Sequence, residues 1–279
     1  MKRLLTLVLL AQMLTIASCV KVNAQTLQRE GWFDDVPLKG NVASVEVVEY
    51  FERKGMYKEN DGSAIYKFNS SGNVYEARTY YNSGALDSKY VYKYNSLGKI
   101  IECAIYDSNG SYSGGTKSKY DSRGNNIEDV NYSGSKIESR VKSIYNSKNQ
   151  LIESTQYSPS STVQIKRLYC YDSNGRQIEF IYCDLVNDER YTYSYKHDSY
   201  GRVVKCIIYN GNGSIESQAV YRYDSQGRNI EIIRYDGRGV KTGNEKLVYD
   251  SRGSLITSTR YSVKDPTGIY STEYHITYR

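Results

Sequence analysis

The feature that most constrains the fold is a short motif, Tyr-Asp/Asn-Ser-x-Gly, that recurs along the chain. Successive copies are 26 residues apart, except for one interval of 25. A fixed period of this length is typical of repeat architectures, in which each unit buries its surface against its neighbours. An earlier, degenerate copy is expected near Gly40. The eight clear copies begin at Phe68, Tyr94, Tyr120, Tyr145, Tyr171, His197, Tyr223 and Tyr249.

The chemistry of the motif predicts a hairpin turn. Asp or Asn at the second position accepts hydrogen bonds from the backbone that follows, which favours a type I turn. Glycine at the fifth position supplies the left-handed conformation that closes a three-residue loop with a bulge. Asn149 replaces this glycine in one copy, and asparagine also adopts that conformation. The predicted turn residues are Gly72, Gly98, Gly124, Asn149, Gly175, Gly201, Gly227 and Gly253.

Two strands are predicted in each repeat. The strand after the turn has Ile or Val at its third position, usually Glu next, and in most copies ends at Tyr. The second strand alternates, with tyrosine at every other position of residues 191–196, which places these rings on one face. The isoleucine and tyrosine columns are expected on opposite faces.

The number of repeats then predicts the shape of the sheet. Eight or nine repeats give about 16 to 18 strands, and open sheets rarely exceed about ten strands without curling or splitting. We therefore expect an all-β fold of antiparallel tandem β-hairpin repeats with a period of 26 residues. These repeats are expected to form a twisted or spiralling extended sheet.

The first residues predict export. Two basic residues precede an apolar run over residues 4–17, which is typical of a signal peptide and shorter than the roughly 20 residues of a membrane span. Cleavage after Ala24 would start the mature chain at Gln25. Alternatively, residues 16–19 resemble a lipobox, which would leave a lipid-bearing Cys19. Both readings place the protein in the periplasm, on the outer membrane surface or outside the cell, without a membrane span after signal removal.

The chain divides into four parts in this interpretation. Residues 1–24 are the signal peptide, and residues 25–65 are an N-terminal cap with the degenerate first repeat. Residues 66–261 hold the repeats, and residues 262–279 provide the C-terminal closing strand or strands. Within the second part, Gly31–Pro37 is expected to cover the first edge of the sheet, because repeat arrays need protected ends.

Several copies resemble a known family. The sequences YDSNGR (171–176), HDSYGR (197–202) and YDSQGR (223–228) are similar to the YD repeats of RHS-type proteins. The resemblance covers roughly residues 66–261. It implies spiralling β-sheets, which in that family form shells around toxins or cell-surface scaffolds, with sugar binding often proposed. The export signal and the Ala24-Gln25 junction resemble those of Bacteroidetes proteins.

The charge and the rare residue types exclude some functions. Removing residues 1–24 lowers the net charge from +6 to +3, and such a dispersed excess does not predict nucleic-acid binding. Only two histidines are present, and no spacing typical of a metal site is found. We expect neither a metal nor a cofactor.

Four cysteines remain apart from Cys19, an even number that is compatible with disulfides in an exported chain. Cys103 and Cys206 occupy the same repeat position four repeats apart. The strand spacing separates them by roughly 38 Å, whereas a disulfide needs Cα atoms within about 7 Å. The pairing of Cys170, Cys183 and the remaining cysteines stays open.

Glutamate and tyrosine columns are the other candidate functional features. Paired carboxylates can hydrolyse glycosides at separations of about 5 to 9.5 Å, and neighbouring repeats would hold the glutamates about 9.6 Å apart. A residue present in nearly every copy is better explained as a structural or solvated ladder, so no catalytic residue is predicted. The tyrosines are expected mainly to pack across strands, while an exposed subset binds sugars or partners.

We therefore expect a non-enzymatic exported repeat scaffold that binds a protein or a glycan at the cell envelope. One alternative is an accessory or degenerate component of an RHS-like toxin shell. Another is a carbohydrate-active enzyme.

Overall fold

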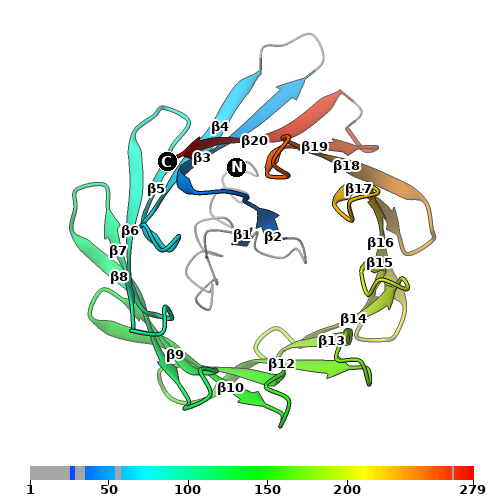
Figure 1. The fold of residues 1–279 in the computed structure, drawn as a ribbon. Coiled ribbons are helices and arrows are strands. Elements are labelled where there is room, and N and C mark those ends of the chain that lie inside the picture. The colour runs from blue at the N-terminus through cyan, green and yellow to red at the C-terminus, as the bar shows by residue number, and fades with distance from the viewer. Residues whose placement is uncertain (1–25, 29–34, 54–57, 266) are drawn as a thin grey trace.

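The protein folds into a closed antiparallel β-barrel (Figure 1). The computed structural model describes residues 26–28, 35–53, 58–265 and 267–279. Strands β1 (Thr26–Gln28) and β2 (Asp35–Pro37) form a separate two-stranded sheet. The other 18 strands each pair with the next along the chain, and β20 pairs with β3 to close the ring. Their bounds are β3 (Val42–Arg53), β4 (Glu59–Phe68), β5 (Val74–Tyr80), β6 (Leu86–Tyr94), β7 (Ile100–Asp107), β8 (Tyr112–Tyr120), β9 (Asn126–Ser133), β10 (Lys136–Tyr145), β11 (Leu151–Tyr157), β12 (Val163–Tyr171), β13 (Gln177–Asp184), β14 (Glu189–His197), β15 (Val203–Asn210), β16 (Ile215–Tyr223), β17 (Asn229–Asp236), β18 (Lys241–Tyr249), β19 (Leu255–Ser262) and β20 (Gly268–Tyr278).

The prediction of an extended, open sheet was wrong, although the antiparallel hairpins are present. A β-bulge in every repeat gives the physical reason. Lys93 pairs with Glu102 and Tyr94 pairs with Ile100, so Ile101 has no partner in the ladder. A bulge bends its strand and increases the local twist, and repeated bulges curve a sheet toward closure, which removes the exposed edges. Next to the motif turns, the bulged residues are Ala43, Tyr75, Ile101, Ile127, Ile152, Ile178, Val204, Ile230 and Ile256.

The two ends of the barrel sequence meet in a ninth turn. Tyr278 pairs with Val42, and the Arg279 backbone N–H donates to the Asn41 carbonyl at 2.8 Å. The same bond joins the second and sixth positions of every continuous motif. Gly40 has a left-handed φ of 91°, as the motif glycines do. The barrel is therefore a ring of nine hairpin units, one of whose turns is split between the chain ends.

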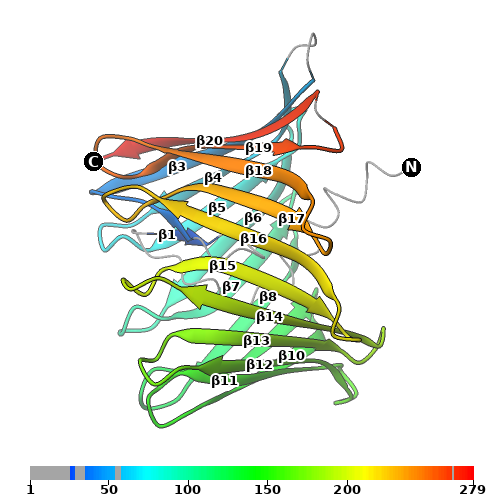
Figure 2. The same ribbon diagram turned by 90° about the vertical axis from the view of Figure 1, so that its right-hand side faces the viewer.

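The tyrosine columns of the second strands line the inside of the ring. Strand β2 lies within the barrel in both ribbon views (Figures 1 and 2). Leu38, directly after β2, is fully buried and shares one apolar cluster with Tyr195, Tyr221 and Leu247. These three strand residues therefore face the lumen. Because alternate residues of a strand point to opposite faces, their neighbours in the strand face outward.

The outward face carries the glutamate column. Four of these glutamates lie 2.6 to 3.1 Å from a lysine or arginine on the adjacent strand: Lys93–Glu102, Lys119–Glu128, Lys166–Glu153 and Arg222–Glu231. A hydrogen bond from Lys119 holds the pKa of Glu128 below its ordinary value. A charged ladder of this kind suits a wall in contact with water.

Motif tyrosines tie each repeat to the one before it. The Tyr223 hydroxyl, for example, donates to the Val203 carbonyl at 2.7 Å. His197 occupies the equivalent position in its own repeat. The remaining bonds of this type are Tyr94 to Val74, Tyr120 to Ile100, Tyr145 to Asn126, Tyr171 to Leu151 and Tyr249 to Asn229.

A buried carboxyl group interrupts the lumen wall on β9. Asp129 is 3% exposed and accepts hydrogen bonds from Ser118 Oγ at 2.6 Å and Asn126 Nδ2 at 2.8 Å. Burial raises the pKa of Asp129 despite these two donors. The folded protein therefore holds this proton more tightly than the unfolded chain does.

Asp129→Asn is expected to stabilise the barrel at neutral pH. The wild type loses folding free energy as pH rises from the unfolded-state pKa of 3.8 through the raised folded-state pKa, and each pKa unit is worth about 1.4 kcal/mol. Asparagine keeps an acceptor for both donors and carries no charge. Urea unfolding at a series of pH values measures the difference. An advantage that does not shrink toward pH 3.8 would contradict this explanation.

Candidate functional site

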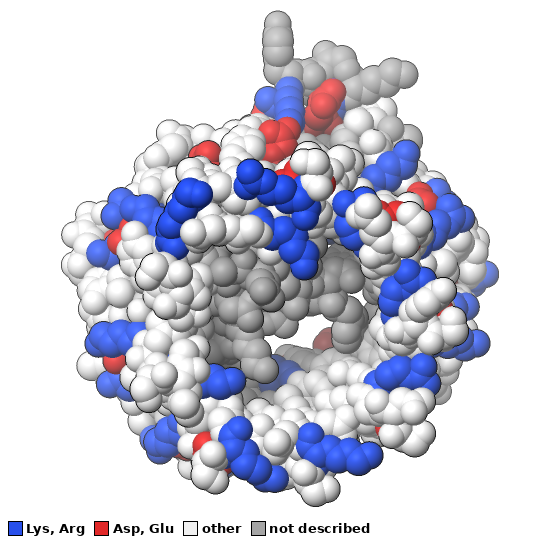
Figure 3. All heavy atoms as spheres, in the orientation of Figure 1, with Lys and Arg blue, Asp and Glu red and all other residues white. Residues whose placement is uncertain are grey.

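The nine regular turns meet at one end of the barrel and surround its mouth. The C terminus lies at this end (Figure 2). Figure 3 looks onto the same end and shows Lys and Arg side chains around the central opening. The turns are the most regular surface of the molecule, so their side-chain chemistry repeats around the ring.

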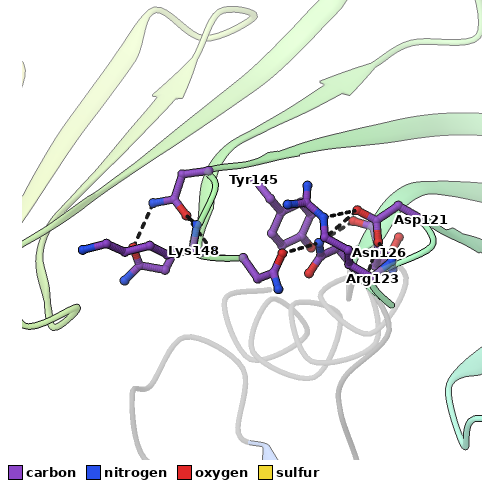
Figure 4. A network of polar contacts seen from close by, with 9 residues as sticks. Asp121, Arg123, Asn126, Tyr145 and Lys148 are labelled. Atoms are coloured by element: carbon purple, nitrogen blue, oxygen red, sulfur yellow. Dashed lines mark hydrogen bonds and ion pairs between the residues drawn. The ribbon is translucent and has the colours of Figure 1, made fainter.

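Hydrogen bonds of the acidic or amide side chain shape each turn. Asp121 Oδ1 accepts from the backbone N–H groups of Arg123 at 2.9 Å and Asn125 at 2.8 Å. The Asn125 side chain also donates to Asp121, and these bonds hold the pKa of Asp121 below its ordinary value. Tyr145 reaches across to the Asn126 carbonyl and links neighbouring repeats (Figure 4). The Asp121 carboxylate is therefore ionised at neutral pH, and its oxygens are used by hydrogen bonds within the turn.

The eight predicted turn residues adopt the left-handed conformation. Their φ angles lie between 61° and 88°, and Asn149 has the smallest value. Asn149 makes the same backbone bond to the second motif position as the glycines make. The fifth motif position therefore serves the backbone and itself carries no side chain larger than asparagine.

The sequence did not reveal a role for the serine at the third motif position. All eight serines are exposed, and within the described ranges their hydroxyls make no hydrogen bond. Asp or Asn and glycine already supply the turn geometry, so the turn does not require this hydroxyl. The serines are Ser70, Ser96, Ser122, Ser147, Ser173, Ser199, Ser225 and Ser251.

Basic residues accompany the serines around the mouth. Arg176, Arg202 and Arg228 form ion pairs of 2.6 to 2.7 Å with the aspartate of their own motif. Lys99 and Lys148 form no ion pair with any carboxylate that the structure describes. Over the nine turns, nine cations face five aspartates. The cations are Lys39, Lys99, Arg123, Lys148, Arg176, Arg202, Arg228, Arg252 and Arg279.

The other predicted features lie apart from this ring. Cys103, Cys170, Cys183 and Cys206 are free thiols, and burial raises the pKa of Cys206 to about 12. No described group of three or more His, Cys, Asp or Glu side chains is arranged to hold a metal ion. In the described part of the chain, no helix has the length and apolar character to cross a membrane. Cys19 and both cleavage sites lie outside the described residues.

Comparison with known proteins gives low similarity throughout. No family model matches the chain, and no curated protein matches it. A porin-like protein from Bacteroides uniformis is 12% identical with a TM-score of 0.47, and the match covers 86% of this chain and 99% of that one. The structure of TcdB2-TccC3-Cdc42 and the Photorhabdus luminescens Tc holotoxin pore each match at 15% identity and a TM-score of 0.34 over 74% of this chain. The chain spans 13% of the length of those toxin chains, and the YD-repeat resemblance stays a prediction.

Proposed function

We propose that this protein is an exported, non-enzymatic scaffold that binds an acidic glycan of the cell envelope on the ring of turns around its mouth. The observation that carries this proposal is the set of eight exposed serine hydroxyls that the turns do not use. The accompanying cations add charge, and the predicted signal peptide supplies the route to the envelope.

The chemistry of the ring matches a polymer rich in hydroxyl groups with sparse negative charge. A serine hydroxyl both donates and accepts hydrogen bonds, and Lys and Arg bind carboxylates through charge-assisted bonds. Neighbouring turns are two strands apart, so each set of groups repeats roughly every 10 Å. Duplex DNA carries one charge per about 1.7 Å, which is much denser than this ring. The spacing therefore favours an acidic glycan over nucleic acid.

The state of the carboxylates in the turns and in the outer column supports a proposal of binding without catalysis. A general acid needs a raised pKa, whereas hydrogen bonds and neighbouring cations lower the pKa of Asp121 and Glu128. The motif aspartates cap turns, and glutamates of the outer column pair with cations. These groups serve the architecture in our proposal, and the ligand leaves unchanged.

A charge and hydroxyl variant of the mouth tests the proposal. We expect Lys99→Gln, Arg123→Gln and Lys148→Gln, combined with Ser122→Ala and Ser147→Ala, to weaken binding to polygalacturonate at least about tenfold, because each lost charged hydrogen bond is worth about 1.5 to 3 kcal/mol. Titration calorimetry at low and high salt measures the affinity. The matched control removes three outward cations by Lys93→Gln, Lys119→Gln and Lys166→Gln and should bind as the wild type does.

Two outcomes would count against this function. A blank acidic-glycan array together with a blank pull-down from envelope extract would remove the proposal. Capture of an envelope protein that the mouth variant loses, with the glycan array blank, would replace the glycan by a protein ligand.

A further inference from the structure

A second site lies at the opposite end of the barrel, away from the regular turns. A cavity of about 350 Å³ opens over strands β16 to β19. Ligand sites are typically clefts of about 300 to 1,000 Å³, so this one has the size for a small molecule. The ends of four strands frame it.

The floor of the cavity is bare backbone. Gly243 pairs with Arg234 on one side and with Ser262 on the other. A Cβ atom at Gly243 would lie 2.4 Å from the Tyr261 carbonyl oxygen, which no real side chain tolerates. Glycine is therefore required where the strands approach, and its missing side chain leaves space between Arg234 and Ser262.

A single buried carboxylate positions two arginines on the cavity wall. Glu245 is 1% exposed, and its Oε2 lies 2.7 Å from Arg234 Nη2 and 3.5 Å from Arg260 Nη2. Ser258 Oγ donates to the other oxygen. Both guanidinium groups are thus fixed before a ligand arrives, which reduces the entropy lost on binding.

The local charge favours an anion. Arg234, Arg260 and Lys264 line the cavity together with Glu216, while Glu245 lies beneath the two arginines. Three cations therefore face two carboxylates. A further lining carboxylate, Asp236, is committed to its own turn.

The Asp236 side chain is used by hydrogen bonds within its own turn. Its Oδ1 accepts from the backbone N–H groups of Arg238 at 3.0 Å and Val240 at 2.9 Å. The Arg238 guanidinium lies 3.5 Å from Oδ2. These bonds lower the pKa of Asp236, so its charge is compensated locally.

We propose that this cavity binds a monosaccharide-sized, polyhydroxylated anion: a sugar that carries a carboxylate or a phosphate group. Arginine pairs recognise both anionic groups through planar, bidentate hydrogen bonds. Ser217, Thr242 and Ser262 offer hydroxyls for the sugar. This site is independent of the mouth, because no residue of the regular turns lines it.

Titration calorimetry with four probes tests the site: glucuronate, glucose 6-phosphate, glucose and inorganic phosphate, all at one ionic strength. We expect one or both sugar anions to bind at least about tenfold more tightly than glucose or phosphate alone, since charged hydrogen bonds and hydroxyl contacts both contribute. The sugar anion that binds with the higher affinity shows whether the carboxylate or the phosphate is the recognised group. Equal binding of inorganic phosphate, or no binding of either sugar anion, would overturn the proposal.

Two variants assign the binding to this cavity. Lys264→Gln and Arg260→Gln should each weaken the bound sugar anion about tenfold, since each removes a charged donor. Arg222→Gln, on the outer face of β16, removes the same charge and should leave the affinity unchanged. Thermal melting verifies that each variant is folded. Unchanged affinity in both cavity variants would overturn the assignment, whereas loss of glycan binding at the mouth alone would affect only the proposed function.

Discussion

Removal of residues 268–279 is expected to abolish the cooperative unfolding transition of this protein. Strand β20 pairs with β3 over eleven residue positions and with β19 over five. Its loss would leave two unpaired strand edges, which are templates for aggregation. It would also remove the buried Tyr274 from the lumen cluster. Circular dichroism during heating and size-exclusion chromatography measure the outcome, which we expect to be an aggregated chain without a sharp melting transition.

A circular permutant is the matched control for this truncation. Joining Arg279 to Lys39 through one serine gives Tyr-Arg-Ser-Lys-Gly, which has the length of the continuous motifs. New termini between Ser122 and Arg123 then open another exposed turn, and such sites tolerate chain breaks. This permutant lacks the buried Leu38, whose loss costs about 2 to 5 kcal/mol, and it keeps all 18 barrel strands. We expect it to fold with a lowered melting temperature.

The pair of variants separates strand pairing from chain order. If the truncated chain melts at the temperature of the wild type, closure by β20 contributes nothing to stability. If the permutant fails to fold, the split turn is not equivalent to the continuous ones. Folding of the permutant alone supports a ring of nine equivalent units.

The local structure could be predicted from the sequence, but the closure could not. The period, the hairpin turns and the alternating strands follow from Asp, Ser and Gly at fixed positions. The ninth unit was visible only as the degenerate copy expected near Gly40, because the rest of its turn comes from Tyr278 and Arg279. Its hydrogen-bonded partners, Asn41 and Arg279, are 238 positions apart. A period search along the chain cannot join them.

The curvature was also hidden. The isoleucine column was expected only to lie on the face opposite the tyrosines, and the pairing places Ile101 and its equivalents at bulges. The bulge follows from how the turn and the strand pairing fit together in three dimensions. Residue type alone does not distinguish a bulged isoleucine from a paired one, and the sheet shape depends on this difference.

The two candidate sites differ in how clearly the sequence indicated them. The constant serines were available as a signal, because Asp or Asn and glycine already explain the turn without a serine hydroxyl. Glu245 was less visible, since it stands in a lumen column that holds Tyr90, Tyr193 and Ala219 in other repeats. Its arginine partners lie on neighbouring strands. The same column also holds Thr116 and Arg167, so a polar residue at this position did not single out Glu245.

Glu245→Ala is expected to lower the free energy of unfolding by about 3 to 5 kcal/mol, which is the usual cost of removing one partner of a buried ion pair. The carboxylate compensates Arg234 and Arg260, and burial already lowers the pKa of Arg234. Without it, two guanidinium groups would repel each other in the lumen wall. Urea unfolding with a common slope for variant and wild type measures the change.

The control residue, Glu231, lies on the outer face of β17, next to the strand that carries Glu245. Glu231 pairs with Arg222 at 2.9 Å, and the Arg222 side chain is 61% exposed. Glu231→Ala should therefore cost no more than about 1 kcal/mol, as exposed ion pairs do. Equal losses in the two variants would contradict a special role for Glu245.

A third variant distinguishes lost attraction from uncompensated charge. Combining Glu245→Leu with Arg234→Met and Arg260→Met removes the whole cluster and keeps similar volume. Replacing a buried ionic triad by apolar residues is often neutral or stabilising by about 1 to 4 kcal/mol, so we expect the triple variant to regain the stability that Glu245→Ala loses. The same variant should no longer bind a sugar anion in the cavity. A stable barrel that has lost only this ligand would show that the cluster is retained for recognition, at no benefit to folding.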